Sequence, residues 1–175
     1  MLNQMRSLIC LALFSVSAAE AATVPLRSLL ASGANVVGSL RVDDDVFYVE
    51  RKTGGGQTLT LAVGQLQSAR AGRVSAVRVL AMREYLTSGE RSIFNKMVLD
   101  TALKCFNLRS ERKAAITTWL KRQNASSLRN VAQSFGPMNL RFIRDISDDG
   151  RYYTYVEMRR TGMPGVAPWI NYCTP

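Results

Sequence analysis

The chain has 175 residues, a length that predicts one domain or two small ones, and its 23 basic and 13 acidic residues give a formal net charge of +10. Hydrophobic residues make up 47% and charged residues 21% of the chain, which excludes a disordered tail, a collagen-like repeat and a multi-span membrane protein. Histidine is absent, which excludes Ser-His-Asp and Cys-His catalytic arrangements, histidine-ligated metal sites and a histidine pH switch.

Residues 1–21 are typical of a secretory signal peptide. Arg6 provides a positive charge ahead of a nine-residue apolar stretch, Leu8 to Val16, and Ala19 and Ala21 place small side chains where a signal peptidase reads them. A membrane anchor is the weaker interpretation, because a helix that spans a bilayer needs about 20 apolar residues. A lipoprotein is disfavoured because no convincing lipobox precedes Cys10.

Cleavage after residue 21 would leave residues 22–175 with an unchanged net charge of +10, because the leader carries one base and one acid. No later stretch is long and apolar enough to span a membrane. We therefore expect a periplasmic or secreted protein, with a bacterial envelope as the favoured setting.

Two cysteines remain after the expected cleavage, Cys105 and Cys173. An even number of cysteines in an oxidising compartment favours a disulfide, which here would tether the end of the chain. The chain-entropy model gives roughly 4 kcal/mol for a loop of about 69 residues. The alternative is a pair of free thiols. A catalytic thiol is disfavoured because the chain has no histidine to activate it.

The first half of the chain predicts a short helix and then an antiparallel meander. Residues 25–31 fit a helix, with proline in its first turn and Gly33 as its end. Turn-forming residues at 43–45 and 53–56 separate three strands over about residues 36–63. Period-two alternation assigns the buried faces of these strands to Leu40 and Val42, Phe47 and Val49, and Leu59, Leu61 and Val63.

The middle of the chain predicts two helices. Residues 74–85 fit either a strand or a helix, and their valines favour a strand. Thr87 and Glu90 have the capping-box spacing, which predicts a helix from about residue 90 to 106. Ser110 is expected to cap a second helix at about residues 111–123, antiparallel to the first. The expected buried face of this second helix is Ala115, Ile116, Trp119 and Leu120.

The last part predicts a β-hairpin and a tail. Apolar runs at 140–146 and 152–158 flank Asp148-Asp149-Gly150, a strong hairpin signal. Alternation assigns Tyr155 and Glu157 to the wet face of the second run. Trp169 and Tyr172 are expected to pack down the proline-punctuated end. Residues 22–175 therefore predict a single α+β domain, in which two central helices pack on an antiparallel sheet formed by the meander and the hairpin.

Arginine supplies 18 of the 23 bases. A guanidinium grips carboxylate or phosphate at two points, so an arginine-rich surface favours an acidic protein or an anionic envelope component: a lipid headgroup, lipopolysaccharide or a cell-wall polymer. The alternative is an ordinary solvated surface. The candidate anion- or partner-binding residues are Arg73, Arg78, Arg83, Arg112, Arg122, Arg141 and Arg151.

Other chemistry is less well supported. The aspartates at 43–45 lack the spacing of an EF-hand, and the glycines at 54–56 lack a P-loop lysine, so both predict turns. Tyrosines 152, 153 and 155 beside Arg151 could stack on bases, but the export signal argues against a nucleic-acid partner. No catalytic residue, metal site or cofactor is assigned.

The leading hypothesis is an exported, non-enzymatic protein that binds an anionic or acidic envelope partner as an accessory, inhibitor or immunity-type module. Another non-enzymatic possibility is a structural or assembly subunit. The alternative from another class is a hydrolase of a cell-wall or glycan substrate that uses two carboxylates among Glu50, Glu84, Asp100, Asp145 and Glu157.

Overall fold

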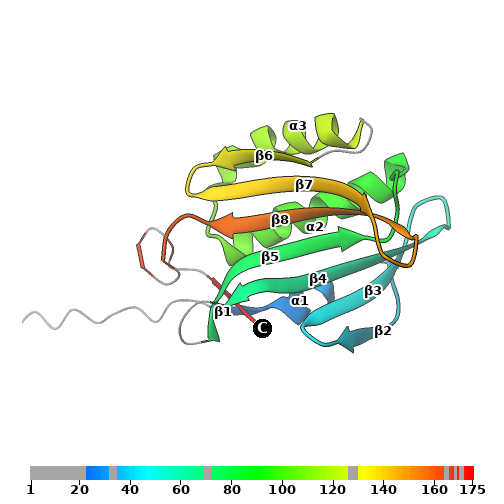
Figure 1. Cartoon of the computed structure of the whole chain (residues 1–175), viewed down its shortest axis with the longest axis horizontal. Helices are drawn as coiled ribbons and strands as arrows, with labels where there is room; N and C mark the ends of the chain where they lie inside the picture. The colour runs from blue at the N-terminus through cyan, green and yellow to red at the C-terminus, as the bar shows by residue number, and fades with distance from the viewer. Residues whose placement is uncertain are drawn as a thin grey trace, which may run out of the picture.

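The structure, a computed structural model, describes residues 23–31, 35–68, 72–125, 130–163, 166–167, 169 and 172–175, so the predicted signal peptide lies outside the described residues. Within them, antiparallel sheet predominates and helices cover one of its faces, which confirms the α+β class (Figure 1).

Seven strands form this sheet in the described residues. Neighbours in sequence pair with each other except at the centre, where β5 pairs with β8. In each half of the chain, helix precedes the strands of this sheet, which then follow one another from an edge to the centre. In spatial order the strands are β2 (Val36–Asp43), β3 (Val46–Lys52), β4 (Thr58–Ser68), β5 (Val74–Ala81), β8 (Tyr152–Arg160), β7 (Met138–Ile146) and β6 (Asn130–Phe135).

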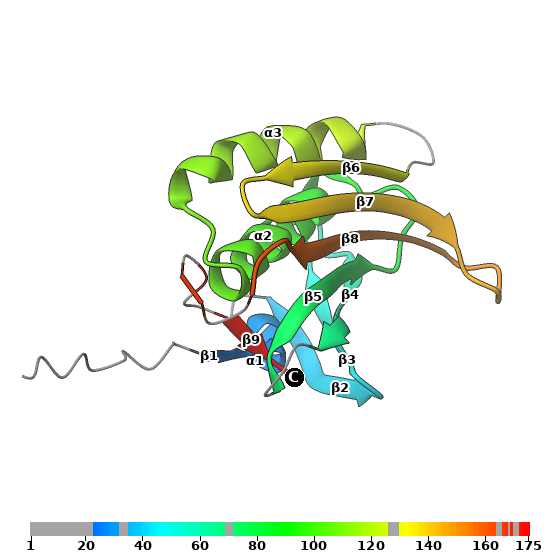
Figure 2. The same ribbon diagram turned by 60° about the vertical axis from the view of Figure 1, so that its left-hand side comes forward.

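Three helices, α1 (Leu26–Ala31), α2 (Ser88–Cys105) and α3 (Lys113–Asn124), lie on the same face of the sheet (Figures 1 and 2). The core fills the space between this face and the helices, where Phe94, Phe106 and Phe142 are fully buried. The opposite face of the sheet carries no helix in the described part of the chain. We call it the open face.

The predicted meander is confirmed as β2, β3 and β4, and residues 74–81 form a strand rather than a helix. The expected burial holds for Val49, Leu59 and Leu61 but is wrong for Val42, which is 61% exposed. The reason is that β2 is an edge strand with an irregular register between Val37 and Arg41, so its alternation does not lead into the core.

The capping box at Thr87 and Glu90 is confirmed, because each side chain accepts a hydrogen bond from the other's backbone N–H. The cap expected at Ser110 is wrong. Residues 110–112 form a short 3₁₀ helix, η2 (Ser110–Arg112), and α3 begins without a side-chain cap. Ile116, Trp119 and Leu120 are buried as expected, but Ala115 is exposed.

The predicted hairpin is formed by β7 and β8, with Ile146 opposite Tyr152 and Gly150 at a φ of 79° in the turn. The wet face expected for Tyr155 and Glu157 is wrong, because these residues are only 9% and 6% exposed. They do lie on the open face, but β8 is central in the sheet and long arginine side chains from its neighbours cover them.

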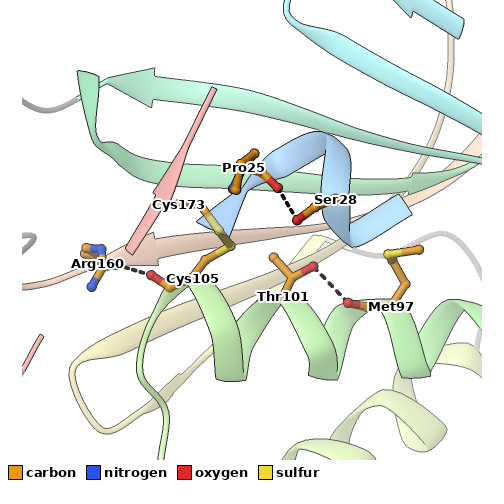
Figure 3. The surroundings of a disulfide bond; sticks show 7 residues. All are labelled: Pro25, Ser28, Met97, Thr101, Cys105, Arg160 and Cys173. Carbon is orange, nitrogen blue, oxygen red and sulfur yellow. Dashed lines mark hydrogen bonds between the residues drawn. A yellow bond between two sulfur atoms is a disulfide. The ribbon is translucent and has the colours of Figure 1, made fainter. Parts of the chain in front are cut away.

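The C-terminal tail is tied down in three ways. Residues 172–174 form β9 (Tyr172–Thr174), which pairs in parallel with β1 (Thr23–Pro25). Cys173 forms the expected disulfide with Cys105, whose Cα lies 4.7 Å away (Figure 3). Trp169 and Tyr172 are buried, as predicted.

Arg160 supports this junction from the end of β8. Its guanidinium donates a hydrogen bond to the carbonyl oxygen of Cys105 (Figure 3). The same group lies over the rings of Phe106 and Trp169, at 4.9 and 5.0 Å from their centres. Burial lowers the pKa of Arg160 to about 10.

Among the described helices, none has the length and apolar character needed to cross a bilayer.

Candidate binding edge of the sheet

The seven candidate arginines do not form one patch. Arg73 lies over the ring of Tyr172, beside the tail. Arg78 and Arg141 stand on the open face, opposite Glu157 on its two neighbouring strands. Arg83 and Arg151 line a pocket at one end of that face. The remaining two, Arg112 and Arg122, belong to η2 and α3.

One carboxylate, that of Glu157, balances part of the positive charge on the open face. Glu157 contacts Arg78 at 3.8 Å and Arg159 at 3.5 Å, measured between nitrogen and oxygen atoms. The guanidinium of Arg78 also lies over the ring of Tyr155, 4.6 Å from its centre. These contacts explain why Glu157 is buried, because the arginine side chains lie over it and over Tyr155.

The pocket lined by Arg83 and Arg151 has a volume of about 760 Å³. Residues of β2 and of the β7–β8 turn share it although three strands separate them in the sheet, which means that the twisted sheet curls toward its open face. Two of its three arginines are matched by acids: Arg83 contacts Glu90 at 3.4 Å, and Arg151 forms an ion pair with Asp149. The third, Arg41, shares the lining of the pocket with Asp43 and Glu84. The pocket therefore offers little surplus positive charge.

The outer edge of β6 has a different character. No described strand pairs with it. Phe135 and Met138 flank the two-residue turn between β6 and β7, so they form a hydrogen-bonded pair. Along β6, residues that hydrogen-bond to β7 alternate with residues whose backbone groups point away from β7. The N–H and C=O groups of Asn130, Ala132 and Ser134 therefore point to the outer side of the sheet. Three donors and three acceptors are thus presented in a row.

β6 also lacks the usual protection of an edge. Its sequence, NVAQSF, has no charged residue. The other edge strand, β2, has an irregular register, a glycine at a φ of 71° and the charged residues Arg41 and Asp43. Charges and bulges are devices that keep other strands away from an edge. Of the two edges, β6 is therefore the one without these two devices.

Three of the candidate arginines flank this edge. Arg112 lies at its C-terminal end, because its Nε would stand 3.2 Å from a Cβ on Gly136 in the β6–β7 turn. Arg141 lies opposite Ala132 on β7, on the open-face side, and its Nε donates to the Asn130 side chain at 2.6 Å. Since this partner is neutral, the charge of Arg141 is not cancelled by it.

Arg122 lies on the helix side of the edge. Ala115, Trp119 and Arg122 recur at helical spacing and share one flank of α3. Trp119 packs edge-on against Phe135 of β6, with 5.8 Å between ring centres, so this flank is the one directed to β6. Figure 2 shows α3 running alongside β6. The exposed Ala115 lies on the same flank, where an added strand would cover it.

The separation between Arg112 and Arg122 is similar to the length of β6. Arg112 and Arg122 are ten residues apart, or about 15 Å along a helix, and the six residues of β6 extend about 20 Å. Arg112, Arg122 and Arg141 form no ion pair with a described acid. The edge therefore combines free backbone groups with positive charge on both sides.

The carboxylates of the hydrolase alternative are partly engaged elsewhere. Asp100 lies on α2 and contacts Lys96 at 2.5 Å, and Glu157 is held by arginines on the open face. Among the described residues, no group of three or more cysteine or acidic side chains is arranged to hold a metal ion.

The backbone edge of β6 was missed by sequence reasoning, although the arginines beside it were not. The dipeptide Gly136-Pro137 is a turn signal immediately before the predicted hairpin strand, and it indicates that another strand precedes it. No family model matches the chain, and comparison with curated proteins and with solved structures finds no significant match.

Proposed function

We propose that this is an exported, non-enzymatic binding protein that captures an extended acidic segment of a partner protein along the outer edge of β6. The observation that carries the proposal is the uncharged free edge of β6, framed by Arg112, Arg122 and Arg141. Strand addition supplies affinity through main-chain hydrogen bonds and specificity through side chains on both faces of the new strand.

Charge selects the segment. An added strand directs alternate side chains to the open face, toward Arg141, and to the helix side, toward Arg112 and Arg122. Acidic residues at either set of positions meet a guanidinium, whereas a basic segment meets repulsion. The chain's net charge of +10 also draws an acidic partner from a distance.

The two cysteines support the export part of the proposal. Both sulfurs are buried in a disulfide that joins α2 to the tail, and such a bond persists in an oxidising compartment.

The test uses a labelled six-residue peptide, as long as β6, with the sequence Glu-Glu-Thr-Thr-Glu-Glu, which places glutamates on both faces of the added strand. Its binding is measured by fluorescence anisotropy at about 50 and 500 mM salt, because the Debye length shortens several-fold over that range. We expect binding that weakens at high salt, and a loss of about two- to five-fold for each of Arg112→Gln, Arg122→Gln and Arg141→Gln.

Two controls accompany this measurement. Arg73→Gln removes a guanidinium beside the tail, so it should leave the affinity unchanged. A peptide with lysine in place of glutamate should not bind. Equal affinity for the acidic and basic peptides, or equal losses in all four variants, would contradict the proposal.

A further inference from the structure

A groove of about 720 Å³ lies between α2 and α3, on the opposite flank of α3 from the β6 edge. Four of the side chains that line it are positively charged and one, Asp100, is negatively charged. The cations come from both walls: Arg91 and Lys96 from α2, and Lys113 and Lys121 from α3.

The groove belongs to a positively charged helical layer, in which Arg112 and Arg122 lie outside the groove, beside β6. Residues 88–124 contain eight bases and three acids, a net charge of +5 and half that of the chain. One of the three acids, Glu90, is only 2% exposed and accepts a hydrogen bond from the N–H of Thr87. Unlike the open face, this layer therefore has cations in clear excess over acids.

The spacing of the cations favours an extended ligand. Lys113 and Lys121 are eight residues apart and so about 12 Å apart along α3, and Arg91 and Lys96 are five residues or about 7.5 Å apart along α2. One small anion cannot reach cations at these separations. A chain with repeated negative charges can contact them in succession.

Polar groups and a shallow apolar floor complete the groove. Ser92, Asn95 and Thr117 are among its lining residues, and Leu99, 8% exposed, is the large apolar one. None of the exposed large hydrophobic side chains in the described residues belongs to 88–124. The helical layer thus has no apolar side chain ready to enter a bilayer, so the charge pattern favours a dissolved polymer over a membrane surface.

We propose that the groove between α2 and α3 binds a linear polyanion with regularly spaced phosphate groups, independently of the acidic segment at β6. The polymer lies along the groove with its phosphates against Arg91, Lys96, Lys113 and Lys121. Lys96 exchanges its contact with Asp100 for one with the polymer or shares the two.

The probe for this proposal is long-chain inorganic polyphosphate, with binding followed as a function of salt. Four cation–phosphate contacts on a single-stranded polymer predict a slope of log K against log salt of about −3. The double variant Lys113→Gln/Lys121→Gln should bring the slope to about −1.4 and weaken binding about tenfold or more at low salt. Lys52→Gln removes an exposed lysine of β3 and should change neither value.

Three further measurements distinguish polyphosphate binding in the groove from binding of single phosphates, of membranes, or at β6. Inorganic orthophosphate at the same phosphate concentration should compete poorly, and vesicles of anionic phospholipid should bind more weakly than polyphosphate. Ala132→Pro, which blocks the β6 edge, should leave polyphosphate binding intact. Wild-type affinity in the double lysine variant, full competition by orthophosphate, or preference for the vesicles would each overturn the proposal.

Discussion

Arg112 of η2 lies directly against Gly136 of the β6–β7 turn. A Cβ added to this glycine would stand 3.1 Å from the central carbon of the guanidinium, and the glycine has a φ of 64°. The primed turns that join two-residue hairpins need a positive φ, which glycine adopts without strain. One residue therefore sets the position of the β6 edge and leaves room for the arginine beside it.

Gly136→Ala should lower the free energy of unfolding by about 1–2 kcal/mol, because an alanine at this φ is strained. It should also weaken binding of the acidic peptide, since the new methyl group displaces Arg112 from the edge. Gly54→Ala is the matched control, because Gly54 has open space around the added Cβ and no positive φ. Urea unfolding of both variants measures this loss. Equal free energies of unfolding for the two variants would show that the positive φ at Gly136 does not require glycine.

The disulfide should account for a large part of the stability. Its cysteines are 68 residues apart in sequence, and the chain-entropy model gives about 4 kcal/mol for a loop of this size. We expect Cys105→Ala/Cys173→Ala to lose roughly 2–5 kcal/mol in denaturant unfolding, and the β1–β9 pairing to lose hydrogen-exchange protection first. Reductant should lower the stability of the wild type and leave the double variant unchanged. A loss of less than about 1 kcal/mol would show that packing alone holds the tail.

The β7–β8 turn should respond to acid. The Arg151 side chain, with Ser147, hydrogen-bonds the carboxylate of Asp149 and holds its pKa well below the usual range. A depressed carboxyl pKa stabilises the folded turn above the ordinary aspartate pKa of about 3.9, and this contribution is lost as the pH falls through the lower folded value. Carbon-13 NMR titration should show Asp149 ionised after other carboxyls have protonated.

Arg151→Gln tests whether the guanidinium lowers the pKa of Asp149, because the Arg151 hydrogen bond makes the largest contribution to that lowering. The pKa of Asp149 should then move up toward its usual range. An unchanged titration in the variant would assign the shift to something other than the guanidinium.

Several features could be predicted from sequence because their causes are local. The capping box needs only Thr87 and Glu90, and the hairpin turn needs a glycine at position 150. The disulfide followed from the number of cysteines and the expected compartment, and the structure brings the two Cα atoms to 4.7 Å.

Other features depend on pairing between distant segments and had no local signal. In β6, asparagine, alanine, glutamine and serine are weak strand formers, and pairing with β7 makes this segment a strand. The parallel pairing of β1 with β9 joins the two ends of the described chain. Ala115 was assigned to the core on helical spacing, but the flank of α3 that carries it faces the sheet edge, where no described strand covers it.

The proposed binding site is the backbone edge of β6, and amide hydrogen exchange reports on each N–H of that edge separately. On saturation with the glutamate–threonine peptide described above, the amides of Ala132 and Ser134 should gain protection, while those of the other edge, β2, should not. Ala132→Pro should abolish binding because it removes an outward N–H, and Ala132→Thr should retain it. Protection that appears at β2 or on the helices, with Ala132 and Ser134 exchanging as in the free protein, would contradict strand addition at this edge.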